Sequence, residues 1–176
     1  MALHKLDEKA RKIKLLLLDV DGVLTDGSII IDHAGEEIKV FNVRDGVAIK
    51  WLQRMGVEVA ILSGRQSPAL SARAQELGIE RVITGKVEKL PSFEKLLEET
   101  GLKTDQIAFM GDDLYDLPVL KRAGISACPS DAVKEVKNIC DYICTAKGGR
   151  GAVRELAEII LKCQNKWREL VKAYDI

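Results

Sequence analysis

The chain has 176 residues, a length that suits one domain spanning residues 1–176. Apolar residues make up 47% of the sequence and charged residues 31%, so a core can form without a disulfide or a structural metal. Lys and Arg together number 27, as do Asp and Glu. This balance gives no general attraction to nucleic acid or to an acidic membrane surface, and we expect neither as a partner.

The cysteines show no metal-binding pattern. Cys140 and Cys144 are separated by three residues, but no second pair of zinc ligands accompanies them. Reduced thiols are therefore expected there and at Cys128 and Cys163. The N-terminus lacks the apolar region of a secretory signal, and no apolar run approaches membrane-spanning length. These features predict a cytoplasmic protein.

The chain begins with a predicted strand, a hairpin and a helix. Residues 15–18 are an unbroken apolar run, which favours a strand buried on both faces. Segments rich in β-formers at 28–31 and 38–41 flank a polar turn and predict a β-hairpin. A helix is predicted at 45–55, with Asp45 as its cap.

The alternation of strands and helices continues from residue 57 onward. Pro68 falls in the first turn of one predicted helix, and Gly78 ends it. The elements expected after the first helix, in chain order, are a strand at 57–62, a helix at 67–78, a strand at 81–84, a helix at 88–100, a strand at 106–110, a short helix at 116–123, a strand at 125–128, a helical turn at 131–136 and a strand at 142–144.

A Gly-rich run at 148–151 precedes an amphipathic tail. Apolar residues recur at helical spacing from Val153 to Tyr174 and predict one long helix. Two interpretations of this helix are open: it covers the sheet, or its end packs on another subunit. The Gly-rich run itself is either an anion-binding helix N-terminus or a flexible hinge.

Alternating strands and helices predict an α/β fold: a Rossmann-like, doubly wound, mostly parallel sheet with helices on both faces. The hairpin is an insertion after the first strand. Ligands of such sheets bind at the carboxyl ends of the strands. The functional residues are therefore expected where the strands end.

Polar side chains follow several of the predicted strands at that point. They are Asp19 and Asp21 after the first strand, Ser63 after the second, Lys89 in the turn after the third, and Asp112 and Asp113 after the fourth. Taken singly, each acid is more simply explained as a helix or turn cap. Because the fold gathers all of them in one crevice, the whole set favours an active site.

The residue types indicate phosphoryl chemistry. Asp19 and Asp21 face the same way on an extended segment, so their charges repel unless a cation or a shared proton lies between them. With Asp112 they form an oxygen-rich set that suits Mg²⁺. One carboxylate can attack phosphorus and a second carboxyl can protonate the leaving group. Lys and Ser side chains stabilise the transferring phosphoryl group.

These motifs resemble those of the haloacid dehalogenase superfamily of phosphatases. The first motif is the run Asp-Val-Asp-Gly-Val-Leu-Thr at 19–25, and the fourth is Gly-Asp-Asp-Leu-Tyr-Asp at 111–116. The second and third motifs are a single Ser and a single Lys. The resemblance implies a catalytic set drawn from the first three motifs: Asp19, Asp21, Ser63 and Lys89.

The same resemblance implies how each acid acts. Asp19 would be the nucleophile and Asp21 the general acid and base. Mg²⁺ would be held by the side chains of Asp19 and Asp112 and by the backbone carbonyl of Asp21. Asp116 would lie behind these ligands, and the role of Asp113 is left open.

Members of this superfamily that carry a cap domain insert it after the first motif or between the second and third. Here 41 residues separate Asp21 from Ser63, enough only for a hairpin, a helix and a strand. Another 25 separate Ser63 from Lys89, enough only for a helix and a strand. We therefore expect no cap domain, and a site open to solvent unless a neighbouring subunit covers it.

Within the superfamily, nearly the whole chain resembles the 3-deoxy-D-manno-octulosonate 8-phosphate phosphatases. The specific segments are Phe-Asn-Val-Arg-Asp-Gly at 41–46 and Gly-Gly-Arg-Gly-Ala-Val-Arg-Glu at 148–155. The resemblance implies a sugar-acid phosphate substrate, Mg²⁺, lipopolysaccharide precursor synthesis, and a homotetramer whose hairpins meet at the interface. The implied substrate contacts are Asp21, Asn42, Val43, Arg44, Asp45, Gly46, Lys50, Arg65, Arg73 and Lys89.

Other functions share part of this pattern. A phosphatase for a nonulosonate 9-phosphate, such as an acylneuraminate, shares these motifs and differs only in substrate. A non-catalytic phosphate-binding module is disfavoured because Asp19 and Asp21 are both present. A signalling receiver domain would need an Asp after its third strand, and residues 81–85 contain none.

Overall fold

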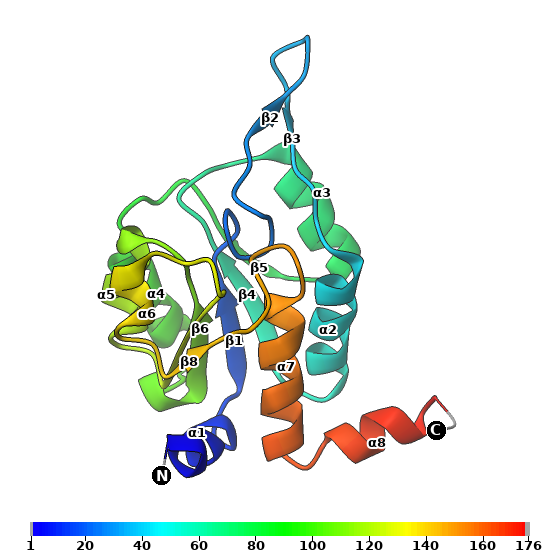
Figure 1. Ribbon diagram of the computed structural model, residues 1–176, viewed down its shortest axis with the longest axis vertical. Helices are drawn as coiled ribbons and strands as arrows, with labels where there is room; N and C mark the ends of the chain where they lie inside the picture. Colours follow the sequence, from blue (N-terminus) through cyan, green and yellow to red (C-terminus); the bar gives the residue numbers. More distant parts are fainter. Residues whose placement is uncertain (1, 175–176) are drawn as a thin grey trace.

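The computed structural model describes residues 2–174, in which a six-stranded sheet lies between two layers of helices (Figure 1). The strand order is β5-β4-β1-β6-β7-β8, and all five neighbouring pairs are parallel. The bounds are β1 Leu15–Leu18, β4 Glu58–Leu62, β5 Arg81–Ile83, β6 Ile107–Met110, β7 Ile125–Cys128 and β8 Tyr142–Ile143. The predicted doubly wound α/β fold is confirmed. The winding reverses between β1 and β6, which is where such sheets bind ligands.

The run of four leucines in β1 supplies both cores. Leu15 and Leu17 pack on one face of the sheet, whereas Leu16 and Leu18 pack on the other, because successive side chains of a strand alternate. The first face is covered by α4 (Lys89–Thr100), α5 (Leu117–Leu120) and α6 (Lys134–Lys137). The second face is covered by α2 (Val43–Arg54), α3 (Pro68–Leu77) and α7 (Ala152–Cys163).

The predicted hairpin is present and projects from the sheet (Figure 1). Its strands are shorter than expected, with β2 at Ile30–Ile31 and β3 at Glu37–Ile38. Asp32 shapes the turn, because its carboxylate accepts hydrogen bonds from the N–H groups of Ala34 and Glu36 at 2.8 and 2.9 Å. Only the hairpin and α2 separate β1 from β4, and only α3 and β5 separate β4 from α4. The expectation that no cap domain is inserted is confirmed.

An N-terminal helix, α1 (Ala2–Ala10), was not predicted from the sequence. Its charged composition hides two buried positions, Leu6 and Ala10, which join the core beside α7. Two 3₁₀ turns, at Thr104–Gln106 and Leu114–Asp116, complete the structure. No helix of residues 2–174 is both long and apolar enough to cross a membrane.

The prediction that Asp45 caps its own helix is wrong. Helix α2 begins two residues earlier, and its N-cap is Asn42, whose side chain accepts from the N–H of Arg44. An Asn before a helical turn is as good a cap as Asp, and here its backbone has the extended conformation that a cap requires. Asp45 in the first turn is then free to bind a different helix.

The prediction of a single long C-terminal helix is also wrong, because the tail forms two helices. Helix α7 ends at Cys163, Asn165 has a left-handed φ of 60°, and α8 (Trp167–Lys172) follows in a new direction. Asn is one of the few residues that tolerates this conformation, so it can end a helix whose apolar spacing continues. Helix α7 covers the sheet, and the ring of Trp167 packs edge-on against Trp51 of α2 with ring centroids 5.7 Å apart.

Candidate active site

The carboxyl ends of β1, β4 and β6 surround an open pocket of about 350 Å³. Six of the residues predicted to act on the substrate or metal line it: Asp19, Asp21, Ser63, Arg65, Lys89 and Asp112. The other lining residues are Gly64, Val87, Asp113, Tyr115 and Asp116. Residues from four separate motifs therefore meet in one place, as the doubly wound fold requires.

Asp19 continues directly from β1, where its N–H donates to the carbonyl of Met110 in β6 at 3.0 Å. Lys89, the first residue of α4, places its ammonium 2.7 Å from Asp19 Oδ1 and 2.6 Å from Asp116 Oδ1. All three residues are buried. A buried lysine between two carboxylates holds both in a fixed geometry and supplies positive charge at the floor of the pocket.

Asp116 is occupied on both of its oxygens. Lys89 binds Oδ1, and the N–H groups of Asp112 and Asp113 donate to Oδ2 at 2.9 and 3.2 Å. Asp116 thus orients the loop that carries Asp112. Gly22 makes room for that loop, because a Cβ there would lie 2.1 Å from Asp112 Oδ2. The φ of Gly22 is 86°, a conformation that also favours glycine.

The carboxyl groups are electrostatically frustrated. Burial raises the pKa of Asp19, and the charge of Asp116 raises it further against the opposing effect of Lys89. Burial raises the pKa of Asp112 to about 8, with the charges of Asp19, Asp116 and Asp113 adding to the effect. A cation between these groups would relieve the repulsion.

The donor set fits Mg²⁺. Oxygen atoms of Asp19, Asp112 and Asp116 all lie within 4.8 Å of one another. Because Asp116 is already bound to Lys89 and to two backbone N–H groups, Asp19 and Asp112 are the side chains available to a metal. Hard oxygen ligands of this kind, completed by backbone carbonyl and water, are those that Mg²⁺ prefers.

Asp21 has a partner that sequence reasoning missed. The ammonium of Lys39, which follows β3 of the hairpin, forms an ion pair and a hydrogen bond with Asp21 Oδ1. It also lies 3.4 Å from Glu37 Oε1, and Arg65 donates to the same oxygen at 2.6 Å. The only sequence signal was alternation: Glu37 and Lys39 share one side of the strand and Ile38 and Val40 the other.

Ser63 and Arg65 follow β4. Ser63 is buried, its N–H donates to the carbonyl of Ile83, and its Oγ accepts from the N–H of Arg65 at 3.3 Å. These contacts fix the turn that presents the serine hydroxyl to the pocket beside Asp19. The guanidinium of Arg65 stays partly exposed at the rim, with 45% of the side chain accessible.

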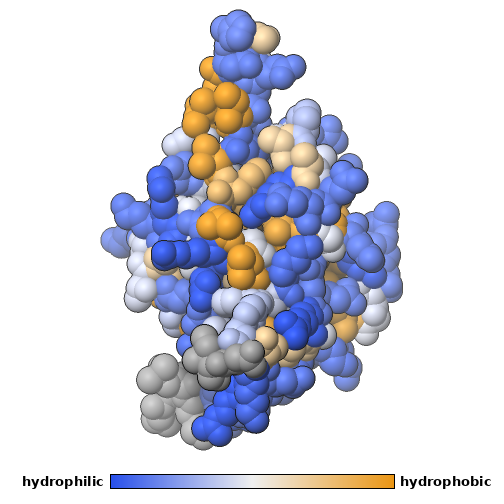
Figure 2. All heavy atoms as spheres, turned by 90° about the vertical axis from the view of Figure 1, so that its right-hand side faces the viewer, coloured by the Kyte–Doolittle hydropathy of each residue, from blue (hydrophilic) through white to orange (hydrophobic). Residues whose placement is uncertain are grey.

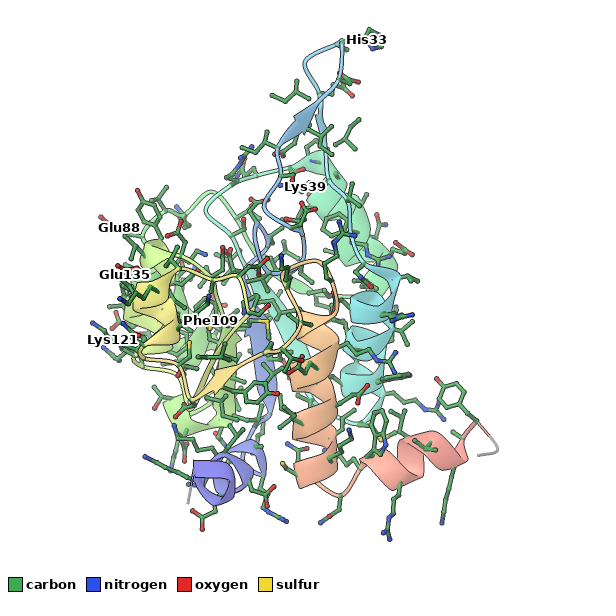
Figure 3. All side chains as sticks on the ribbon, viewed as in Figure 1. His33, Lys39, Glu88, Phe109, Lys121 and Glu135 are labelled. Carbon is green, nitrogen blue, oxygen red and sulfur yellow. The ribbon has the colours of Figure 1, made fainter. Side chains whose placement is uncertain are left out.

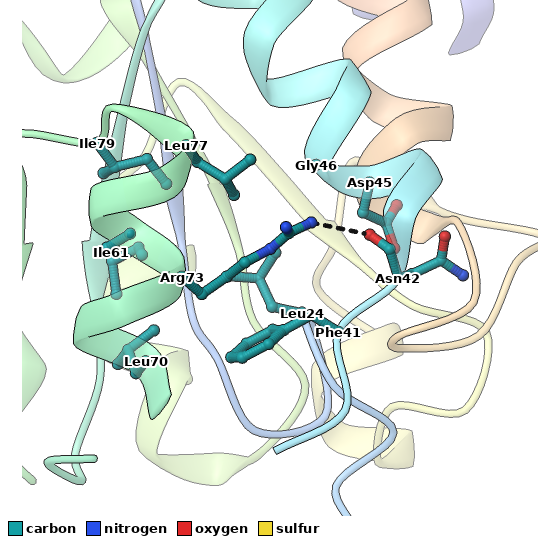
Figure 4. A pocket seen from close by; sticks show the side chains of 11 residues that line it. Leu24, Phe41, Asn42, Asp45, Gly46, Ile61, Leu70, Arg73, Leu77 and Ile79 are labelled. Atoms are coloured by element: carbon teal, nitrogen blue, oxygen red, sulfur yellow. Dashed lines mark hydrogen bonds between the residues drawn. The ribbon is translucent and has the colours of Figure 1, made fainter. Parts of the chain in front are cut away.

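The other predicted substrate contacts do not line this pocket. Asn42, Asp45, Gly46 and Arg73 surround a separate cavity of about 10 Å³ between α2 and α3 (Figure 4). Arg73 Nη2 lies 3.5 Å from the carbonyl oxygen of Asn42, and a Cβ on Gly46 would lie 2.2 Å from the same nitrogen. Val43, Arg44 and Lys50 lie exposed on α2, away from the lining of the acidic pocket.

Comparisons with known proteins agree with this geometry. The family model for haloacid dehalogenase-like hydrolases matches residues 32–124. The chain is 44% identical, over 92% of its own length and 89% of the relative's, to the 3-deoxy-D-manno-octulosonate 8-phosphate phosphatase of Haemophilus influenzae.

Solved structures extend the similarity to the whole fold. The phosphatase of the same name from Moraxella catarrhalis, solved in complex with magnesium, phosphate and KDO, superposes with a TM-score of 0.95 at 38% identity, covering 97% of this chain and 98% of that one. The cobalt-bound phosphatase of Haemophilus influenzae gives a TM-score of 0.87 at 44% identity, covering 90% of this chain and 92% of that one. With its motifs, its fold and these relatives in agreement, the chain belongs to the haloacid dehalogenase-like hydrolases.

Proposed function

We propose that this chain hydrolyses 3-deoxy-D-manno-octulosonate 8-phosphate to the free sugar acid and phosphate, a step in lipopolysaccharide precursor synthesis. The observation that carries the proposal is the identity of 44% to a phosphatase of that name over 92% of the chain. The pocket supports it, because Asp19, Asp21 and Lys89, the proposed nucleophile, acid and phosphate-binding lysine, line it together.

Asp19 is the proposed nucleophile. Its buried carboxylate attacks phosphorus and the ester P–O bond breaks, which leaves an aspartyl-phosphate and the sugar alkoxide. Asp21 gives a proton to that leaving oxygen and later takes one from the water that attacks the aspartyl-phosphate. Lys89 and the hydroxyl of Ser63 stabilise the negative charge of the transferring phosphoryl group.

Mg²⁺ is the proposed cofactor, and the side chains of Asp19 and Asp112 with the backbone carbonyl of Asp21 would hold it. When bound, the ion would neutralise charge on the phosphoryl oxygens and on the carboxylates around them. Asp116 keeps the loop of Asp112 in place through the N–H groups of Asp112 and Asp113.

The substrate end of the site is proposed from the family resemblance. Arg65 lies at the rim of the pocket, where its guanidinium suits the substrate's carboxylate or phosphate. The other proposed contacts do not line this pocket in the single subunit, and we propose that a neighbouring subunit brings them to a substrate. These contacts are Asn42, Val43, Arg44, Lys50 and Arg73; Asp45 and Gly46, which the resemblance also implied, are buried, and both oxygens of Asp45 are bound to the N-terminus of α7.

A homotetramer fits this requirement. The hairpin and the start of α2 expose a run of apolar side chains, visible in orange in Figure 2. They are Ile29, Ile30, Ile31, Ile38, Val40, Val43 and Val47, each at least 39% exposed. A contiguous apolar surface of this kind is typical of a protein interface. The whole chain is proposed to be one catalytic domain, and its four free thiols suit the reducing cytoplasm.

The test is phosphate release with Mg²⁺ from a panel of esters: the eight-carbon sugar-acid phosphate, a nonulosonate 9-phosphate, hexose phosphates and an aryl phosphate. The proposal expects kcat/KM for the eight-carbon acid to exceed that of every other sugar phosphate. A preference for the nine-carbon acid would retain the chemistry and replace the substrate. Absence of release from every ester would leave only a phosphate-binding role.

A further inference from the structure

Lys39 is a charged residue that the proposed mechanism does not use, yet 97% of its side chain is withdrawn from solvent, since the exposed fraction is 3%. Figure 3 places it on the lower part of the hairpin, well below His33 at the tip. An ammonium with so little access to water requires compensating partners, because burying an unpaired charge is strongly unfavourable. Its two carboxylate partners are Asp21 and Glu37.

These contacts belong to a chain of alternating charges. It runs from Asp21 to Lys39, from Lys39 to Glu37 at 3.4 Å, and from Glu37 to Arg65 at 2.6 Å. Three segments are joined in this way: the loop after β1, the hairpin strand β3 and the turn after β4. The side chain of Asp21, 28% exposed, is thereby held from the hairpin side.

We propose that Lys39 is a positioning residue for Asp21, an inference that rests on the acid role of Asp21 in the proposed function. Lys39 donates to Oδ1 of Asp21, so Oδ2 is the oxygen left to carry the transferable proton. As the ester P–O bond breaks, that proton passes from Oδ2 to the leaving oxygen. Lys39 keeps its own proton throughout and keeps Oδ2 directed at the leaving group.

A consequence for assembly follows, because Lys39 is carried by the hairpin. The residues on either side of it, Ile38 and Val40, are 47% and 60% exposed and belong to the proposed interface. A contact that fixes the hairpin therefore also fixes Lys39, and through Lys39 the carboxyl of Asp21. The hairpin links assembly to the proton-transfer step.

The test compares Lys39→Met, Lys39→Arg and the control Glu36→Gln on two esters, the sugar-acid phosphate and an activated aryl phosphate whose leaving group needs no proton. General acid catalysis contributes on the order of 10²- to 10⁴-fold, so Lys39→Met should lower kcat/KM, which reports the steps up to formation of the aspartyl-phosphate, on the order of 10²-fold for the sugar ester and only a few fold for the aryl ester. Lys39→Arg should restore most of the loss. Glu36 lies on the same hairpin and is exposed, so its variant should match the parent on both esters.

Adding Lys39→Met to Asp21→Asn should cause little further loss, because both changes remove the same proton transfer. If Asp21→Asn lowers kcat/KM only for the sugar ester but Lys39→Met lowers it equally for both esters, the positioning role is wrong and the acid role stands. If Asp21→Asn itself lacks leaving-group dependence, the acid role fails and Lys39 has nothing to position. Light scattering and thermal melting check assembly and folding; where Lys39→Met does not fold, Lys39→Gln, which keeps a donor without the charge, replaces it.

Discussion

Asp45 in the first turn of α2 caps a helix that lies more than a hundred residues further along the chain: its Oδ1 accepts a hydrogen bond from the N–H of Arg154 at 2.8 Å. Its second oxygen accepts from the N–H of Gly151 at 3.1 Å. Asp45 is 1% exposed, and both oxygens are therefore spent on the N-terminus of α7. The same carboxylate places the Gly-rich run next to the loop that follows Asp19.

That run supports the loop that follows the proposed nucleophile. The N–H of Gly149 donates to the carbonyl of Val23 at 2.9 Å, and the side chain of Asn42 donates to the carbonyl of Gly149 at 3.2 Å. The approach is close: a Cβ on Gly149 would lie 2.6 Å from the carbonyl carbon of Thr25. Of the two interpretations of the Gly-rich run, a flexible hinge agrees least with this packing.

The first prediction concerns Asp45→Ala. Losing a helix cap costs about 0.5–2 kcal/mol, and leaving buried N–H groups unpaired adds to that, so we expect a loss near the upper end of this range. We also expect kcat to fall while KM stays unchanged, because the loop after Asp19 loses its support. Urea unfolding measures the first effect and steady-state kinetics the second.

The exposed pair of Asp105 with Lys12 supplies the control, since Asp105→Ala should change the unfolding free energy by less than about 0.5 kcal/mol. If Asp45→Ala were as harmless as Asp105→Ala, the capping role would be wrong. A rise in KM with unchanged kcat and unchanged stability would instead support the direct substrate contact that the sequence implied.

Asp45 also shows how much of the structure could be predicted from the sequence. The parallel sheet, the hairpin and the gathering of acids at the strand ends were predictable, because apolar runs and breakers are local signals. The partner of Asp45 was not, because a carboxylate in a first turn can cap its own helix or a distant one with the same sequence. Lys39 was missed for a similar reason: nothing in a hairpin sequence shows which acidic residue its lysine will contact.

The tail illustrates a second limit. Helical spacing continues across Asn165, so periodicity alone predicts one helix. The break at Asn165 depends on tertiary contacts that compete with continuation of the helix. Trp167 packs on Trp51, whose indole N–H donates to the hydroxyl of Tyr174 at 3.0 Å, and the guanidinium of Arg154 lies 4.4 Å from the Trp51 ring centroid. These contacts return α8 to the same subunit.

The second prediction is that Asp19→Asn abolishes turnover while the protein still folds. An amide cannot attack phosphorus, and removing a nucleophile costs on the order of 10³-fold or more in kcat. Phosphate release measures the loss, and circular dichroism checks the fold. The exposed acid Asp105, changed to Asn, should leave turnover unaltered. Activity of Asp19→Asn within a few fold of the parent would contradict the nucleophile assignment.

The third prediction concerns pH and metal removal. Burial and the neighbouring acids raise the pKa of Asp112 to about 8 in the metal-free protein, above its ordinary value of 3.8. The folded state therefore holds this proton more tightly than the unfolded state does. The metal-free protein should lose stability as pH rises from about 4 to about 8, the range between the two pKa values, with no further change from this group above it.

Bound Mg²⁺ should prevent this loss of stability at higher pH, because it stabilises the ionised carboxylates. The Mg²⁺-dependent rise in Tm should accordingly be larger at pH 8 than at pH 5, where the ion must displace a proton. Thermal melting of EDTA-treated and Mg²⁺-loaded samples at the two values measures it. In Asp112→Asn both the ion's effect and its pH dependence should shrink. A larger stabilisation at pH 5 would contradict the assignment of Asp112 as a ligand.

The fourth prediction tests the proposed interface. Ile31 is 63% exposed and Ile38 47% exposed, on facing strands of the hairpin. Replacing both by Lys places like charges in the proposed apolar interface, and at several copies per assembly the proposed tetramer should dissociate at micromolar concentration. Light scattering measures the mass. Both side chains point to solvent in the single subunit, so replacing them removes no core contact. Loss of core packing should therefore not lower the Tm of the dissociated variant.

Ile139→Lys is the matched control, since Ile139 is also exposed, at 36%, and lies outside the hairpin. It should leave the mass of the assembly unchanged. Activity distinguishes two roles of assembly: if neighbours supply substrate contacts, the hairpin variant should lose kcat/KM on the sugar-acid ester more than on the small aryl ester. If the hairpin variant kept the mass of the parent assembly, the apolar hairpin would not be the interface. If the variant were monomeric and kept the parental activity on both esters, each pocket would act without a neighbouring subunit.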